Sequence, residues 1–227
     1  MLLEVSGLEA FYGASQALFG VDLAVDRGEV VALLGRNGMG KTTSIGSILG
    51  LLQSRRGNLR FDDTDISRLP AHRIARLGIG LAPEGRRCFP NLTVRENLLA
   101  AARPGAWTPA RVAALFPRLE ERKDQYANTL SGGEQQMLAI GRALMTNPKL
   151  LILDEATEGL APAIRQDIWS AIRNLKAGGQ SILVVDKALA EMLAIADRAF
   201  VLEKGVTVWR GRPAELAAEI QDRYLGV

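Results

Sequence analysis

The chain contains the stretch Gly35-Arg36-Asn37-Gly38-Met39-Gly40-Lys41-Thr42, with the pattern G-x-x-x-x-G-K-[ST]. The apolar run before it, residues 30–34, is typical of a buried strand, and residues 43–49 after it carry apolar side chains spaced for one helix face. A strand, a glycine-rich loop and a helix in this order form a phosphate-binding site. We therefore predict a phosphate site here, rather than a turn that binds nothing.

Three properties of this stretch favour phosphate binding. Its glycines can adopt positive φ, so successive backbone N–H groups can point inward around an anion. The N-terminus of the following helix adds unpaired N–H groups and the positive end of its dipole. Lys41 can reach the β- and γ-phosphates, and the hydroxyl of Thr42 can ligate Mg²⁺.

The composition excludes several other classes of protein. Of the 227 residues, 48% are apolar and 23% are charged, as in soluble globular proteins. No apolar run approaches the roughly 20 residues of a membrane-spanning helix, and no signal peptide is expected. The single cysteine, Cys88, excludes an internal disulfide, and the single histidine, His72, is expected at the surface. A net charge of +3 is too mild to indicate nucleic-acid binding.

The order of strand-like and helical segments predicts an α/β fold in one domain, residues 1–227. Two extended runs before residue 30 predict an N-terminal antiparallel β layer on a parallel core. Helical patterns dominate residues 84–148, which we predict to be a helical subdomain inserted into a nucleotide-binding core of residues 1–83 and 149–227. Within these regions we expect one helix from Gln135 to Met145 and a last helix from about Pro213 to Ile220.

A second chemical signal is the pair Asp154-Glu155, which directly follows the apolar strand-like run of residues 150–153. A carboxylate at the end of such a strand, beside a phosphate loop, can hold Mg²⁺. The next carboxylate can orient and deprotonate an attacking water. The alternative is a solvated pair at a strand end, which four preceding apolar residues make the weaker interpretation.

A third signal, Leu130-Ser131-Gly132-Gly133-Glu134-Gln135-Gln136, precedes a helix and would by itself be an ordinary helix cap. Its position between the phosphate loop and Asp154-Glu155 resembles the ATP-binding-cassette (ABC) ATPases, which have a Ser-Gly-Gly signature in that order. The resemblance covers essentially the whole chain. It implies a P-loop ATPase that binds ATP and Mg²⁺ and hydrolyses ATP.

The resemblance also implies a role for particular residues. Tyr12 matches the aromatic that stacks on adenine, Glu155 matches the catalytic glutamate, and Glu84 replaces a glutamine that touches Mg²⁺ and the attacking water. The family forms head-to-tail dimers, in which Ser131 and Gly133 would close over ATP on the partner's phosphate loop. The implied ATP-binding residues are Tyr12, Gly35, Arg36, Asn37, Gly38, Met39, Gly40, Lys41, Thr42, Thr43, Ser131, Gly132 and Gly133; the implied metal ligands are Thr42, Glu84 and Asp154.

Three further stretches resemble the second ATPase subunit of branched-chain amino acid importers: Pro83–Arg87, Phe89–Val94 and Glu158–Pro162. Such importers also need two membrane-spanning permeases and an external solute-binding protein. The resemblance implies a peripheral location at the cytoplasmic face of the inner membrane, with a chain that is soluble when isolated. Phe89, Pro90 and Leu92 are the expected permease contacts.

The chain departs from the family pattern at two positions. Lys187 stands where the family has a histidine that senses the γ-phosphate, and Ala161 stands where many members have an aspartate. Lysine keeps a positive charge but cannot relay a proton as neutral imidazole can. We count Lys187 among the catalytic residues and expect slower hydrolysis at the site built on this chain's own phosphate loop.

Two other classes stay open on the sequence alone. One is a soluble ABC ATPase associated with nucleic acid or ribosomes. The chain argues against this class because it has no coiled-coil insertion and only one cassette. The other is a nucleotide-binding regulator without hydrolytic activity, which Lys187 alone favours.

Overall fold

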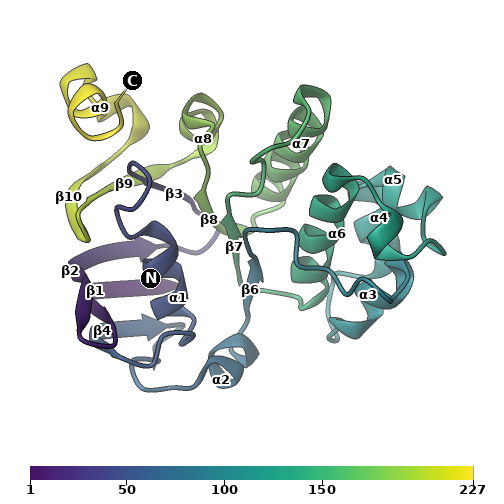
Figure 1. Ribbon diagram of the computed structural model, residues 1–227, viewed down its shortest axis with the longest axis horizontal. Helices are drawn as coiled ribbons and strands as arrows, with labels where there is room; N and C mark the ends of the chain where they lie inside the picture. The colour runs from purple at the N-terminus through teal and green to yellow at the C-terminus, as the bar shows by residue number, and fades with distance from the viewer. Residues whose placement is uncertain (227) are drawn as a thin grey trace.

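The structure is a computed structural model that describes residues 1–226. Its strands form one ten-stranded sheet in the order β5-β4-β1-β2-β10-β9-β3-β8-β7-β6 (Figure 1). The strands are β1 (Leu3–Tyr12), β2 (Ser15–Val25), β3 (Val30–Leu34), β4 (Arg55–Phe61), β5 (Thr64–Asp65), β6 (Ile79–Ala82), β7 (Leu150–Asp154), β8 (Ser181–Val185), β9 (Arg198–Glu203) and β10 (Val206–Gly211).

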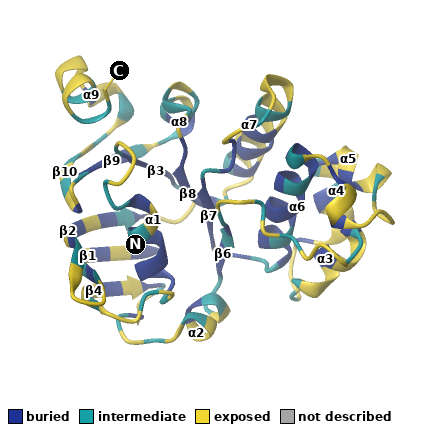
Figure 2. Ribbon diagram, in the orientation of Figure 1, coloured by how far each residue is buried: buried dark blue, intermediate teal, exposed yellow. Residues whose placement is uncertain are grey.

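The centre of the sheet is parallel and buried on both faces. β3 pairs in parallel with β8 and β9, and β7 pairs in parallel with β8 and β6. Alternate residues of β3 enter two separate hydrophobic cores: Val30, Ala32 and Leu34 face one, Val31 and Leu33 the other. A strand that is covered on both faces has apolar residues on both sides, which explains the continuous apolar sequence of β3. Figure 2 shows the central strands as buried along their length.

The predicted antiparallel layer is present at the N-terminal end of the sheet. β1 pairs antiparallel with β2 and β4, and β4 with β5. This layer continues into the parallel strands through β10, which pairs with β2 at Val206 and Gly20 and antiparallel with β9. The predicted α/β class is confirmed.

Helices cover both faces of the sheet. They are α1 (Lys41–Ile48), α2 (Ala71–Arg76), α3 (Val94–Ala100), α4 (Pro109–Leu115), α5 (Pro117–Glu121), α6 (Gly132–Met145), α7 (Pro162–Ala177), α8 (Leu189–Ile195) and α9 (Ala218–Tyr224), with short 3₁₀ turns at Ala127–Thr129 and Pro213–Glu215. α3 to α6 all fall between β6 and β7 in the chain, and Figure 1 shows them together on one side of the molecule.

Two helix boundaries differ from the sequence prediction. α6 begins at Gly132 instead of Gln135, because Ser131 and Glu134 form a capping box that draws the preceding residues into the first turn. The predicted last helix is instead a 3₁₀ turn followed by α9. Leu216 is buried between them, and its carbonyl accepts a hydrogen bond from Gln221 Nε2 (2.9 Å) instead of continuing a helix.

Residues 1–226 include no helix that is both long enough and apolar enough to pass through a membrane.

Candidate nucleotide-binding and hydrolysis site

The phosphate loop, residues 35–42, connects β3 to α1 and depends on glycine at two positions. Gly35 has φ 144° and Gly40 has φ 101°. A β-carbon on Gly35 would lie 2.5 Å from the carbonyl oxygen of Leu202, and one on Gly40 would lie 2.6 Å from Cδ2 of Leu18. A larger residue at position 35 would therefore push the loop away from the backbone of β9, and one at position 40 would be strained at positive φ and would displace the side chain of Leu18. Because Gly40 is the N-cap and has no side chain, the first N–H groups of α1 are not capped by it and can face an anion.

Lys41 is held inside this loop. Its Nζ donates to the carbonyl oxygens of Gly35 (2.7 Å) and Arg36 (3.0 Å), and the residue is only 9% exposed. Burial lowers the pKa of Lys41, whereas the nearby charges of Glu155 and Asp154 raise it. The ammonium group therefore lies between the loop and the two carboxylates, where it can exchange backbone carbonyls for phosphate oxygens.

A cavity of about 450 Å³ opens beside the loop. It is lined by Leu34, Gly35, Arg36, Asn37, Lys41, Asp186, Lys187, Leu189, Met192 and Leu225. The side chain of Met39 contacts the turn between β9 and β10, where its Sδ accepts a hydrogen bond from the N–H of Lys204 (3.2 Å). Tyr12 ends β1, with its hydroxyl 3.4 Å from Oγ1 of Thr43 in the first turn of α1 and 56% of the residue exposed. An exposed aromatic ring therefore lies beside the phosphate loop, as adenine stacking would require.

Asp154 ends β7 and is 3% exposed. Burial and the charge of Glu84 raise its pKa to about 6, although Lys41 and a hydrogen bond from Thr42 oppose this shift. Within residues 1–226, its Oδ1 is buried and has no hydrogen-bond partner. A buried carboxylate oxygen without a donor is costly, and a hard divalent cation is a partner that such an oxygen accepts. Thr42 and Asp154 therefore fit a Mg²⁺ ion.

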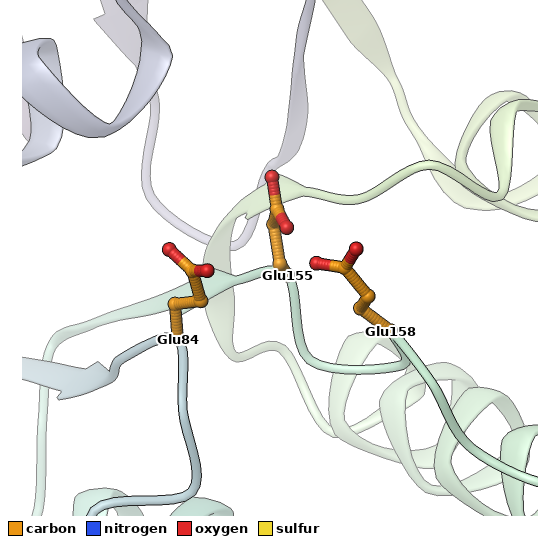
Figure 3. Close-up of side chains that lie close together, drawn as sticks. All are labelled: Glu84, Glu155 and Glu158. Atoms are coloured by element: carbon orange, nitrogen blue, oxygen red, sulfur yellow. The ribbon is translucent and has the colours of Figure 1, made fainter. Parts of the chain in front are cut away.

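Three carboxylates meet just beyond β7 (Figure 3). Glu84, Glu155 and Glu158 each place one oxygen within 4.8 Å of the other two. A hydrogen bond with Glu158, burial and the charge of Glu158 raise the pKa of Glu155 to about 7, although Lys187 opposes this shift. A carboxyl group with a pKa near 7 is suited to accept a proton from water at neutral pH. The geometry therefore brings the predicted base, Glu155, next to Glu84, and adds Glu158 to them.

The loop that follows Glu155, residues 155–161, is attached to the end of β8. Lys187 forms an ion pair with Glu158 through its Nζ. Asp186 accepts hydrogen bonds from the N–H (2.9 Å) and the hydroxyl (2.8 Å) of Thr157. Lys187 and Asp186 also line the cavity, so the same two residues contact both the cavity and this loop.

Sequence reasoning assigned no role to Glu158 or Asp186. The available signal for Asp186 was its place directly after the apolar strand β8, just as Glu155 directly follows β7. Glu158 carried no such signal, because its contact with Lys187 joins residues 29 positions apart.

The signature loop, residues 131–133, lies apart from the cavity. Ser131 caps α6, and none of Ser131, Gly132 and Gly133 lines the cavity beside the phosphate loop. Figure 1 shows α6 on the opposite side of β6 and β7 from α1. Within one chain, the two glycine-rich stretches therefore do not form a joint site.

Known proteins resemble this chain in sequence. The ABC transporter family matches residues 18–158. The high-affinity branched-chain amino acid transport ATP-binding protein BraG of Pseudomonas aeruginosa PAO1 is 43% identical over 235 residues, covering 99% of this chain and 100% of BraG. The lipopolysaccharide export system ATP-binding protein LptB of Escherichia coli K12 is 35% identical over 233 residues, covering 99% of this chain and 97% of LptB.

The solved structures that resemble this chain belong to the same family as its sequence relatives. An ATP-binding subunit of an ABC transporter aligns with a TM-score of 0.84 at 31% identity, covering 100% of this chain and 97% of that one. The ADP conformation of MJ1267, an ATP-binding cassette of an ABC transporter, aligns with a TM-score of 0.78 at 29% identity, covering 97% and 95%. The chain therefore belongs to the ABC transporter family. Within that family it is an ATP-binding ATPase subunit, the class predicted first from its sequence.

The residue directly after the signature loop, Glu134, is a carboxylate whose charge is stabilised by the fold. Glu134 is 5% exposed, and its Oε2 accepts hydrogen bonds from the N–H and the hydroxyl of Ser131, both at 2.8 Å. Its Oε1 lies 2.5 Å from Nε of Arg122. Burial raises the pKa of Glu134, but the hydrogen bonds from Ser131 and the ion pair with Arg122 outweigh it and hold the pKa below its usual value.

We expect Glu134→Gln to lower the free energy of unfolding by about 1 kcal/mol at pH 7, since the charge-assisted contacts are lost. A lowered pKa means that the folded state binds fewer protons than the unfolded state, so this stabilisation is present above the unfolded pKa of about 4.5 and disappears as pH falls through the folded value. Urea unfolding at pH 7 and pH 4 measures it, with the exposed Glu219→Gln as a control. An equal loss at both pH values would contradict the assignment.

Proposed function

We propose that this chain is the ATP-hydrolysing subunit of an importer for branched-chain amino acids or related solutes. The observation that carries this proposal is the 43% identity to BraG, whose name assigns it to branched-chain amino acid transport, over nearly the full length of both chains. Identity to the lipopolysaccharide exporter LptB is 35% over the same length. Import is therefore the better supported direction of transport.

The active form in this proposal is a head-to-tail dimer. Its support is the separation of the signature loop from the cavity of its own chain. Ser131 and Gly133 of one chain then close over the ATP bound to the phosphate loop of a second ATPase subunit, either a homologous partner or a second copy. Two ATP molecules are sandwiched between the chains, and hydrolysis reopens the dimer to move the permeases.

Each half of the dimer carries out hydrolysis with residues of both chains. The phosphate loop and Lys41 hold the β- and γ-phosphates, and Tyr12 stacks on adenine. Mg²⁺ held by Thr42 and Asp154, with Glu84 close by, neutralises charge on the phosphate oxygens when it is bound. Glu155 orients the attacking water and accepts its proton, for which a pKa of about 7 is suited.

A groove between α2 and α6 is the proposed permease-docking surface. It encloses about 450 Å³ and is lined by Leu49, Leu51, Ala71, His72, Ala75, Ile79, Gly80, Leu81, Pro83, Arg87, Ala101, Ala139, Arg142, Ala143 and Thr146. Arg142 also stacks over the exposed ring of Phe89, 4.2 Å from its centroid, so the predicted contact Phe89 borders this groove. In this proposal the groove takes a cytoplasmic segment of a permease, and the chain works at the cytoplasmic face of the membrane.

We expect Glu155→Gln to lower kcat for ATP hydrolysis by at least about 100-fold, because the amide cannot accept the proton of water. The variant still binds ATP, so it accumulates as an ATP-bound dimer that elutes at twice the monomer mass in size-exclusion chromatography. Lys41→Ala is the control, since it loses phosphate contacts and stays monomeric. Hydrolysis at the parent rate would show that Glu155 is not the base.

Two substitutions of Lys187 distinguish the effect of proton relay on turnover from the effect of positive charge. We expect Lys187→His to raise turnover by about tenfold in the assembled transporter, because neutral imidazole can relay a proton. Lys187→Arg keeps the positive charge and is not expected to raise turnover. Steady-state ATPase assays of the two variants and the parent measure this effect. No change or a fall for Lys187→His would contradict the hypothesis of slow hydrolysis at this site.

Transport itself is tested by co-purifying the chain with its two permeases and reconstituting them in vesicles. With the external solute-binding protein present, we expect leucine, isoleucine or valine to stimulate ATP hydrolysis and solute uptake. Glu155→Gln should keep the complex intact but abolish both activities. Failure of the permeases to co-purify, or stimulation by lipopolysaccharide instead of amino acids, would overturn the importer assignment.

A further inference from the structure

Arg86 occupies a backbone conformation that few residues with a β-carbon adopt. It lies between β6 and α3 with φ 52°, directly after Gly85 with φ 83°. Left-handed backbone at a residue other than glycine is uncommon and persists where surrounding contacts hold it. The contacts that hold Arg86 come from two loops that are distant from it in the sequence.

The first contact is with the signature loop. A β-carbon built on Gly132 would lie 2.7 Å from Cζ of Arg86, so the guanidinium fills the space that a side chain at position 132 would occupy. The second contact is with the 155–161 loop. Nη2 of Arg86 donates to the carbonyl oxygens of Glu158 (3.5 Å) and Gly159 (3.4 Å). One guanidinium thus bridges residues 132 and 159.

Arg86 forms no ion pair with a carboxylate within the described residues, 1–226. The N-terminus of the 14-residue helix α6, against which it packs, carries the positive end of the helix dipole and disfavours a cation. The two carbonyl groups of the 155–161 loop are therefore the favourable partners of the guanidinium, and they tie it to that loop.

We propose that Arg86 is a positioning residue that ties the signature loop to the 155–161 loop within one chain and thereby couples the two ATP sites of the dimer. This inference rests on the proposed function, because only in a head-to-tail dimer do these loops serve different ATP molecules. Glu155 then acts on the ATP of its own chain, and Ser131 acts on that of the partner.

The coupling follows a continuous set of contacts. Lys187 and Asp186 line the chain's own cavity and hold the 155–161 loop through Glu158 and Thr157. Arg86 contacts that loop at Gly159 and also contacts Gly132, which is next to Ser131. A displacement of the loop at one ATP therefore moves the residues that cover the other ATP.

Four variants test this role: Arg86→Ala, Arg86→Gly, Arg86→Lys and the exposed control Arg173→Ala, which removes one positive charge from α7. We expect Arg86→Ala and Arg86→Gly to lower the Hill coefficient for ATP from about 2 to about 1 and kcat by about tenfold, with KM within about twofold of the parent. Arg86→Lys keeps the charge without the planar fork and should recover part of the cooperativity. Arg173→Ala should match the parent.

Two further measurements distinguish loss of the Arg86 contacts between the two loops from a general loss of structure. Arg86→Gly removes the left-handed strain together with the guanidinium, so its unfolding midpoint should stay within about 2 °C of the parent while cooperativity is lost. Hydrogen exchange of the monomeric chain should become faster in peptides covering residues 131–134 and 157–160 in both Arg86→Ala and Arg86→Gly, but not in Arg173→Ala.

The outcomes distinguish this inference from the proposed function. A parent chain that hydrolyses ATP without cooperativity, together with a Glu155→Gln variant that stays monomeric in ATP, would overturn the dimer and with it the coupling. A cooperative parent whose Arg86 variants behave like Arg173→Ala would overturn the inference alone. Unchanged hydrogen exchange in the two loops would overturn the tie in either case.

Discussion

The burial of the central parallel strands on both faces is the constraint on which the rest of the structure depends. β3, β7 and β8 are buried along their whole length and separate two hydrophobic cores, so helices or strands must cover each side of the sheet. Because these strands are parallel, their carboxyl ends meet at one edge. That edge holds the phosphate loop after β3, Asp154 at the end of β7 with Glu155 after it, and Asp186 and Lys187 after β8.

Gathering these groups at the edge of a buried sheet changes their chemistry. Asp154 is removed from water, and its pKa rises to about 6 although Lys41 is close. Glu155 shares a hydrogen bond with Glu158, and its pKa rises to about 7. A site that holds several carboxylates so close together is balanced by cations, which Lys41 and Lys187 supply in part. The carboxylates that crowd negative charge at this edge are therefore suited to a cation such as Mg²⁺, whereas the two lysines are suited to phosphate oxygens.

The contacts of the 155–161 loop show how the site extends beyond the residues that face the cavity. Thr157 is held by Asp186, Glu158 by Lys187, and the backbone of residues 158 and 159 by Arg86. These three partners come from the segments that follow β6 and β8. The loop after the predicted base is thus positioned by the core on one side and by the start of the helical segment on the other.

Local patterns in the sequence determined much of this protein by themselves. The spacing of glycine, lysine and threonine after an apolar strand located the phosphate loop, and Asp154-Glu155 after a second apolar strand located the carboxylates, because strand burial and loop chemistry are both encoded within a few residues. Only the tertiary structure decided which side chains meet across the chain: Glu158 with Lys187, Arg86 with Gly132 and Gly159, and the buried Oδ1 of Asp154 without a partner within residues 1–226. It also decided that the signature loop stays apart from the phosphate loop. Such contacts depend on the order of the strands in the sheet and on how deeply each charged group is buried. A short stretch of sequence determines neither of these.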